Sequence, residues 1–106
     1  MNHTDIVLVL CTAPQGEAEE IARRLVEERR VACVNITPVR SVYRWDGEVV
    51  CDEEQLLICK TTAGEIGDLI RRIEAIHSYE VPEVLAIPVP EGSLPYLDWV
   101  RSEVCG

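Results

Sequence analysis

The feature that most constrains the fold is an Asp-Gly dipeptide that joins two long β-rich runs over residues 31–62. A type I′ turn needs positive φ at both central residues, and Asp46-Gly47 readily adopts it. A two-residue loop here predicts the facing pairs Trp45–Glu48, Tyr43–Val50 and Arg40–Glu53. Pro38 cannot donate to a ladder, so we expect a bulge or a loose edge there. Each of the two runs exceeds the usual strand length of about six residues, which predicts that the hairpin pairs with something outside its own chain.

The segments that flank the hairpin have the patterns of further strands and helices. Apolar residues recur at i, i+3, i+4 and i+7 in the helical segments. The expected elements are a strand over 5–11, a helix over 15–30, a helix over 63–77, a strand over 84–89 and a short helix over 94–104. This is the split βαβ order, which predicts a ferredoxin-like α+β sandwich, βαββαβ with an extra C-terminal helix, in a single domain over residues 1–106.

The first strand is apolar on both of its faces, although two helices on one side can cover only one face of the sheet. One face carries Ile6, Leu8 and Leu10, and the other carries Val7, Val9 and Cys11. An apolar sheet face left in water is a patch large enough to drive association. The sequence therefore predicts a closed homo-oligomer whose sheets face inward and whose hairpins reach neighbouring subunits.

The charge balance argues against one class of partner. The chain has 19 acidic and 10 basic residues and a formal charge of −9, whereas a nucleic-acid partner calls for clustered Lys and Arg. We expect no nucleic-acid partner and interpret the acidic faces as solvated. No apolar run approaches the length that crosses a bilayer, and the first residues have a strand pattern rather than that of a signal peptide. We therefore expect no membrane partner and a cytoplasmic location.

The five cysteines indicate neither a disulfide framework nor a structural zinc site. Their number is odd, and no C-x-x-C spacing occurs. Free cysteine in such a chain is most often a small buried hydrophobe.

Six short blocks stand in an order and spacing typical of one known family. They are VLCT (9–12), ACVNI (32–36), SVYRWDG (41–47), LICKT (57–61), HSYEVPE (77–83) and YLDW (96–99). Over nearly its whole length the sequence resembles the CutA family, the divalent-cation tolerance proteins. The resemblance implies a compact homotrimer of ferredoxin-like subunits, similar in shape to the PII signalling proteins, with a role in tolerance to copper and other divalent cations.

The same resemblance implies a candidate metal site. Copper binding is proposed for some bacterial members, through a cysteine at the position of Cys11 and a histidine at that of His77. Where some members have a second, preceding histidine, this chain has Ile76. Thiolate and imidazole suit copper and zinc, and Glu83, Glu80, water or a neighbouring subunit could complete the ligand set. Two alternatives stay open: Cys11 is a buried core thiol, and His77 is a helix C-terminal residue that interacts with the helix dipole.

Five aromatic residues and one lysine are candidates for a pocket or a subunit interface. The aromatic residues are Tyr43, Trp45, Tyr79, Tyr96 and Trp99. They could form a small pocket between subunits, but aromatic residues more often pack an interface core, and we favour packing for Trp45 and Trp99. Lys60 lies at a strand-to-helix junction, where backbone N–H groups can hold an anion; the alternative is an ion pair with Glu83 or Glu54.

No orienting Asn or Asp motif and no oxyanion-type glycine turn accompanies the Cys–His pair, so we do not expect an enzyme. The sequence predicts a trimeric protein that binds copper or another divalent cation and contributes to metal tolerance. The alternative is a PII-like signalling scaffold, which binds a small ligand in the clefts between subunits and passes the signal to a partner protein.

Overall fold

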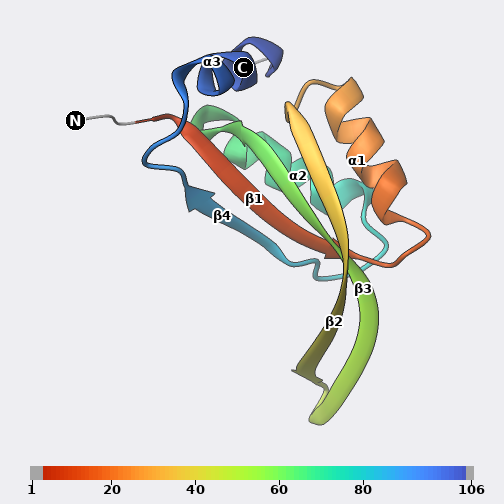
Figure 1. Cartoon of the computed structure of the whole chain (residues 1–106). Coiled ribbons are helices and arrows are strands. Elements are labelled where there is room, and N and C mark those ends of the chain that lie inside the picture. Colours follow the sequence, from red (N-terminus) through yellow and green to blue (C-terminus); the bar gives the residue numbers. More distant parts are fainter. Residues whose placement is uncertain (1–3, 105–106) are drawn as a thin grey trace.

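The chain forms a four-stranded antiparallel sheet with two helices on one face and a third helix at one end (Figure 1). The computed structural model describes residues 4–104. The elements are β1 (Ile6–Ala13), α1 (Ala18–Glu27), β2 (Cys33–Trp45), β3 (Glu48–Thr62), the 3₁₀ turn η1 (Ala63–Glu65), α2 (Ile66–Ile76), β4 (Val84–Pro88) and α3 (Leu94–Glu103). The strand order β2-β3-β1-β4 confirms the predicted ferredoxin-like α+β fold with its extra C-terminal helix.

The main core lies between the sheet and the pair α1 and α2. Its fully buried members include apolar residues from both helices and the sheet: Val9, Cys11, Leu25, Leu57, Cys59, Leu69 and Ile73. A smaller cluster holds α3 against one end of the sheet, where Leu97 and Val100 pack on Ile6. The sheet therefore has one fully covered face, and α3 protects only the end of the other.

Helix α1 is shorter than predicted at both ends. Before it, residues 15–17 form a turn, in which the Glu17 N–H donates to the Pro14 carbonyl. After it, Arg29 has a φ of 59°, a left-handed conformation that an α-helix cannot continue through.

The hairpin has the predicted turn and register. Asp46 and Gly47 both have positive φ, 51° and 79°, as a type I′ turn requires. Pairing runs without interruption from Cys33–Lys60 to Trp45–Glu48, so the expected bulge at Pro38 is wrong. Hydrogen-bonded and non-hydrogen-bonded pairs alternate away from the turn, which places Pro38 in a non-hydrogen-bonded pair on an edge strand. Its missing N–H therefore costs no ladder bond.

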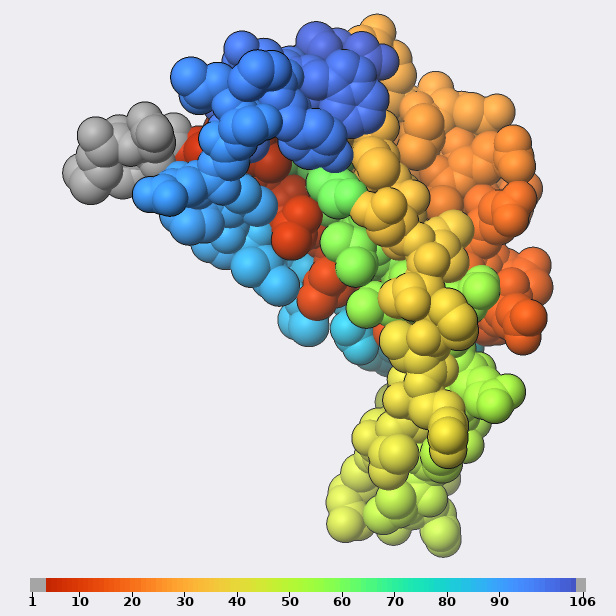
Figure 2. All heavy atoms as spheres, in the orientation of Figure 1, coloured from red at the N-terminus to blue at the C-terminus, as the bar shows by residue number. Residues whose placement is uncertain are grey.

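The outer half of the hairpin extends past the end of β1 and away from the helices (Figures 1 and 2). Large apolar side chains on it face water in the isolated chain: Val42 is 69% exposed, Trp45 56% and Val49 68%. We call this projecting segment, residues 39–54, the arm.

The second face of the sheet, the open face, is apolar and largely uncovered. Beyond Ile6, which α3 covers, strand register places these aliphatic side chains on it: Leu8, Leu10, Leu56, Ile58, Leu85 and Ile87. Leu85 is 55% exposed and Ile87 43%. Figure 2 shows this face with the strands visible and only α3 lying over one end. The predicted apolar sheet face is confirmed.

Candidate binding site between the arm and the 77–83 loop

The loop over residues 77–83, which leads from α2 to β4, is held against the start of α1 by one carboxylate. Glu17 Oε1 accepts a bond from the Ser78 backbone N–H at 2.7 Å, and Oε2 accepts one from the Ser78 hydroxyl at 2.6 Å. Burial tends to raise the pKa of Glu17, but these two bonds and the neighbouring His77 outweigh it and hold that pKa below its usual value. The carboxylate thus stays ionised and fixes the loop.

Both ring nitrogens of His77 are used inside the protein. Nε2 lies 2.8 Å from the carbonyl oxygen of Thr12, and Nδ1 lies 3.0 Å from the backbone nitrogen of Tyr79. A carbonyl only accepts and an amide N–H only donates, so Nε2 carries the proton and Nδ1 is the acceptor. The His77 side chain is fully buried, and its ring packs against that of Tyr79 with centroids 4.6 Å apart. His77 therefore connects the loop to the end of β1.

Cys11 is a buried thiol on the covered face of the sheet. It is 0% exposed, and its Sγ lies 3.6 Å from the carbonyl oxygen of Thr12. Burial, followed by the carboxylates of Glu83, Glu17 and Glu54, raises the pKa of Cys11 to about 12. The thiol is therefore protonated at neutral pH, and the reactive thiolate form is suppressed.

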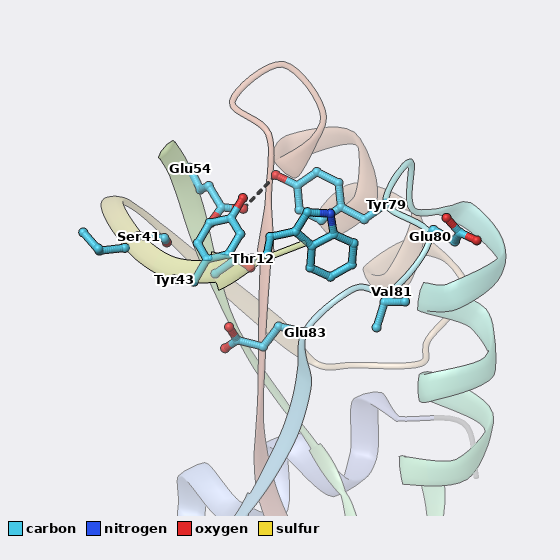
Figure 3. A pocket seen from close by; sticks show the side chains of 10 residues that line it. Thr12, Ser41, Tyr43, Glu54, Tyr79, Glu80, Val81 and Glu83 are labelled. Carbon is cyan, nitrogen blue, oxygen red and sulfur yellow. Dashed lines mark hydrogen bonds between the residues drawn. The ribbon is translucent and has the colours of Figure 1, made fainter. Parts of the chain in front are cut away.

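A cavity of about 660 Å³ lies in the angle between the arm and the 77–83 loop (Figure 3). The arm contributes one side of its lining: Ser41, Val42, Tyr43, Trp45 and Glu54. The loop contributes the other: Tyr79, Glu80, Val81 and Glu83, with Thr12 of β1 between the two. We call this space the arm–loop cavity; Thr12, whose carbonyl oxygen contacts His77, is one of its lining residues.

The arm–loop cavity is aromatic and acidic. Three glutamates line it, and its lining contains no lysine or arginine among the described residues. The Tyr79 hydroxyl donates to Glu54 Oε2 at 2.7 Å and so ties the loop to β3. Burial, together with this bond, raises the pKa of Tyr79, and the hydrogen bond to Asp52, with some burial, raises the pKa of Tyr43 to about 12. Both phenols therefore remain neutral hydrogen-bond donors at neutral pH.

The structure brings some of the predicted site residues together and separates others. Tyr43, Trp45, Tyr79 and Glu83 line the cavity, and Cys11 and His77 form the layer behind Thr12. Lys60 is elsewhere: its Nζ contacts Asn35 Oδ1 and lies 3.8 Å from Cys33 Sγ, so its expected pairing with Glu83 or Glu54 is wrong. Trp99 is on α3, where its ring packs against Tyr96.

The clamp between Glu17 and Ser78 was not predicted from the sequence, nor were four lining residues of the cavity: Thr12, Ser41, Val42 and Val81. The clamp joins residues 61 positions apart, and no local pattern indicates such a contact. Only Ser41 and Val42 had a weak signal, because they lie in the hairpin, whose register was predicted.

Cys11 and His77, the copper ligands that the resemblance implies, do not form a preformed copper site in this fold. The two nitrogens of His77 are engaged, and Cys11 is a buried protonated thiol. Over residues 4–104, no group of three or more His, Cys, Asp or Glu side chains is close enough to hold a metal ion. Ligation by Cys11, His77 and Glu83 stays a prediction.

The fold and the site together define a class: a ferredoxin-like protein with an extended hairpin arm and a binding cavity at its base. None of the helices described over residues 4–104 is long and apolar enough to cross a membrane. Comparison with known proteins narrows the class. The model of the family described as "CutA1 divalent ion tolerance protein" matches residues 7–103, and the chain belongs to this family of non-catalytic tolerance proteins.

Three relatives illustrate the match. The Divalent-cation tolerance protein CutA of Thermus thermophilus is 53% identical over 96 residues, 89% of this chain and 93% of that protein. The chloroplastic CutA protein of Arabidopsis thaliana is 43% identical over 98 residues, and the chain spans 54% of its length. The solved structure described as the PII-like protein CutA from Nostoc, in apo form, has a TM-score of 0.90 at 40% identity and covers 93% of this chain and 97% of its own.

Proposed function

We propose that this chain functions as a PII-like homotrimer in the response to divalent cations. The observation that carries the proposal is the open face, where aliphatic side chains from three strands form one apolar surface. Exposed patches of this kind mark association surfaces. Three copies with these faces turned inward would bury them in a closed ring, and each arm would reach a neighbouring subunit.

Light scattering tests this assembly directly. We expect the purified protein at micromolar concentration to have about three times the 11.9 kDa mass of one chain. Leu85→Glu, which places a charge on the open face, should yield folded subunits of the single-chain mass. Ala75→Glu adds the same charge on the exposed side of α2 and should remain assembled. A wild-type protein with the mass of one chain would refute the proposal.

Copper binding through Cys11, His77 and Glu83 is the finer proposal that the resemblance supplies. For this site to form, His77 would have to release Thr12 or Tyr79, and Cys11 would have to lose a strongly held proton. Copper titration of the wild type against Cys11→Ser and His77→Ala decides the matter. Loss of one copper equivalent per subunit in both variants would establish the two residues as ligands, and unchanged stoichiometry in both would refute the site.

A cytoplasmic location is also part of the proposal. Cys11, Cys33, Cys51 and Cys59 are all free thiols, which suits a reducing compartment. Fractionation of cells that express the full protein tests this location, and recovery outside the cytoplasm would contradict it.

A second candidate function is supported by the arm–loop cavity. Its size lies within the range of small-molecule sites, and it is built at the base of the arm. A ligand there would contact the arm and the 77–83 loop together, and so could couple binding to the position of the arm and to a partner protein.

A further inference from the structure

We propose that the arm–loop cavity binds a linear aliphatic polyamine, a flexible ligand with several separated ammonium groups. This inference rests on the proposed small-ligand role of the cavity and names the chemical class of that ligand. The residues that line the cavity in the isolated subunit all belong to one chain, so ligand binding can be measured separately from trimer formation.

The charge of the cavity selects a cation. Glu54, Glu80 and Glu83 contribute three carboxyl groups, with no basic residue in the described lining to neutralise them. Glu80 and Glu83 have no hydrogen-bond or ion-pair partner within residues 4–104, and the side chain of Glu54 bonds there only to the hydroxyl of Tyr79. Nucleotides and other organic anions would be repelled by such a site.

The spacing of the carboxylates selects a ligand with more than one charge. Figure 3 shows Glu54, Glu80 and Glu83 at three separate places around the cavity. No group of three or more His, Cys, Asp or Glu side chains that could hold a metal ion occurs within residues 4–104, so the three carboxylates do not form a preformed metal site. A ligand whose ammonium groups are several methylenes apart can approach each carboxylate, whereas a point charge can approach only one.

The remaining lining suits the methylene segments between those charges. The rings of Tyr43, Trp45 and Tyr79 and the side chains of Val42 and Val81 supply an apolar surface. Alkyl chains pack on such surfaces, and an ammonium group over an aromatic face gains a cation–π attraction. The volume of about 660 Å³ leaves room for an extended ligand rather than a bare ion.

Tryptophan fluorescence of the full chain tests the proposal with spermidine. Trp99→Phe removes the only other tryptophan, so that emission reports on Trp45 in the cavity. We expect saturable binding of spermidine. Hexaamminecobalt(III), which carries the same charge of +3 in compact form, is the control for general attraction to an acidic protein, and it should bind more weakly.

Two matched substitutions locate the binding. Glu83→Gln should weaken spermidine binding about three- to tenfold, the effect of removing one partly exposed charge pair. Glu74→Gln changes the net charge equally on the exposed side of α2 and should leave the affinity unchanged. Unaltered thermal melting would confirm that Glu83→Gln is folded.

Three results would overturn the inference: no saturation by spermidine at millimolar concentration, equal affinity for hexaamminecobalt(III), or equal effects of the two substitutions. Light scattering on the same samples separates this test from that of the trimer. Saturable binding to a protein of single-chain mass would refute the assembly and leave the ligand class standing.

Discussion

The two faces of the sheet are made from similar residues, and they differ in what covers them. Val7, Val9 and Cys11 of β1 lie on the covered face and are at most 5% exposed. Leu8 and Leu10 alternate with them on the same strand, yet they lie on the open face and are only half-buried. Strand alternation explains this pattern, since one face can be buried by α1 and α2 and the other cannot.

An apolar pattern in the sequence therefore predicts that residues are buried, but it does not indicate whether the same chain or another chain buries them. On the covered face, burial is complete within one subunit and contributes to its folding. On the open face, apolar area can leave water only when subunits associate. That burial, about 25 cal/mol per Å², would stabilise the oligomer. A single chain that exposes Leu85 and Ile87 has not used all of its hydrophobic driving force.

The largest effect is expected from a comparison of two single variants, each of which truncates a leucine on one face of the sheet. Leu69 is 0% exposed in the main core, and Leu69→Ala should lower the free energy of unfolding by about 2–5 kcal/mol. Leu85→Ala on the open face should cost the dissociated subunit less than about 1 kcal/mol and should instead raise the concentration at which the oligomer dissociates. Urea unfolding and sedimentation equilibrium give the two quantities. Equal losses of subunit stability would abolish the distinction between the faces.

Most of this two-faced architecture could be predicted from the sequence, because it depends on local patterns. The Asp46-Gly47 turn fixed the hairpin register, and the alternation over residues 5–11 indicated an apolar open face. The surroundings of Cys11 and His77 could not be predicted. They depend on contacts from distant segments: the Thr12 carbonyl is 65 residues from His77, and the pKa of Cys11 depends on burial and, to a lesser extent, on the carboxylates of Glu83, Glu17 and Glu54. Residue type indicated metal ligands there, whereas tertiary contacts use the same groups for packing and hydrogen bonding.

A smaller effect is expected in the reactivity of two cysteine thiols, Cys59 on the covered face and Cys33 on the open face. Burial, with smaller effects from Cys11 and Cys33, raises the pKa of Cys59 on the covered face to about 12. Its thiolate fraction at neutral pH is about a thousandfold below that of an ordinary thiol. Cys33 pairs with Lys60 and so shares the open face with Leu8.

Alkylation followed by peptide mass spectrometry should therefore modify Cys33 in dissociated Leu85→Glu subunits and leave Cys59 unmodified. In the wild type, assembly should slow the reaction of Cys33 as well. Rapid modification of Cys59 in the folded protein would show that the covered face opens readily.

The smallest effect is expected at the 77–83 loop, which Glu17 holds against the start of α1. Because the pKa of Glu17 is lower in the folded chain than in the unfolded one, its ionised form contributes stability. That contribution is complete above the unfolded value of about 4.3 and is lost as the pH falls through the lower folded value. Glu17→Gln should thus be less stable than the wild type at pH 7, with the difference shrinking below about pH 4. Glu20→Gln, on the exposed side of the same helix, is the matched control for charge. Urea midpoints measured between neutral and acidic pH give the comparison, and a wild-type advantage that persists at the lowest pH would show that the Ser78 bonds do not depend on the ionised carboxylate.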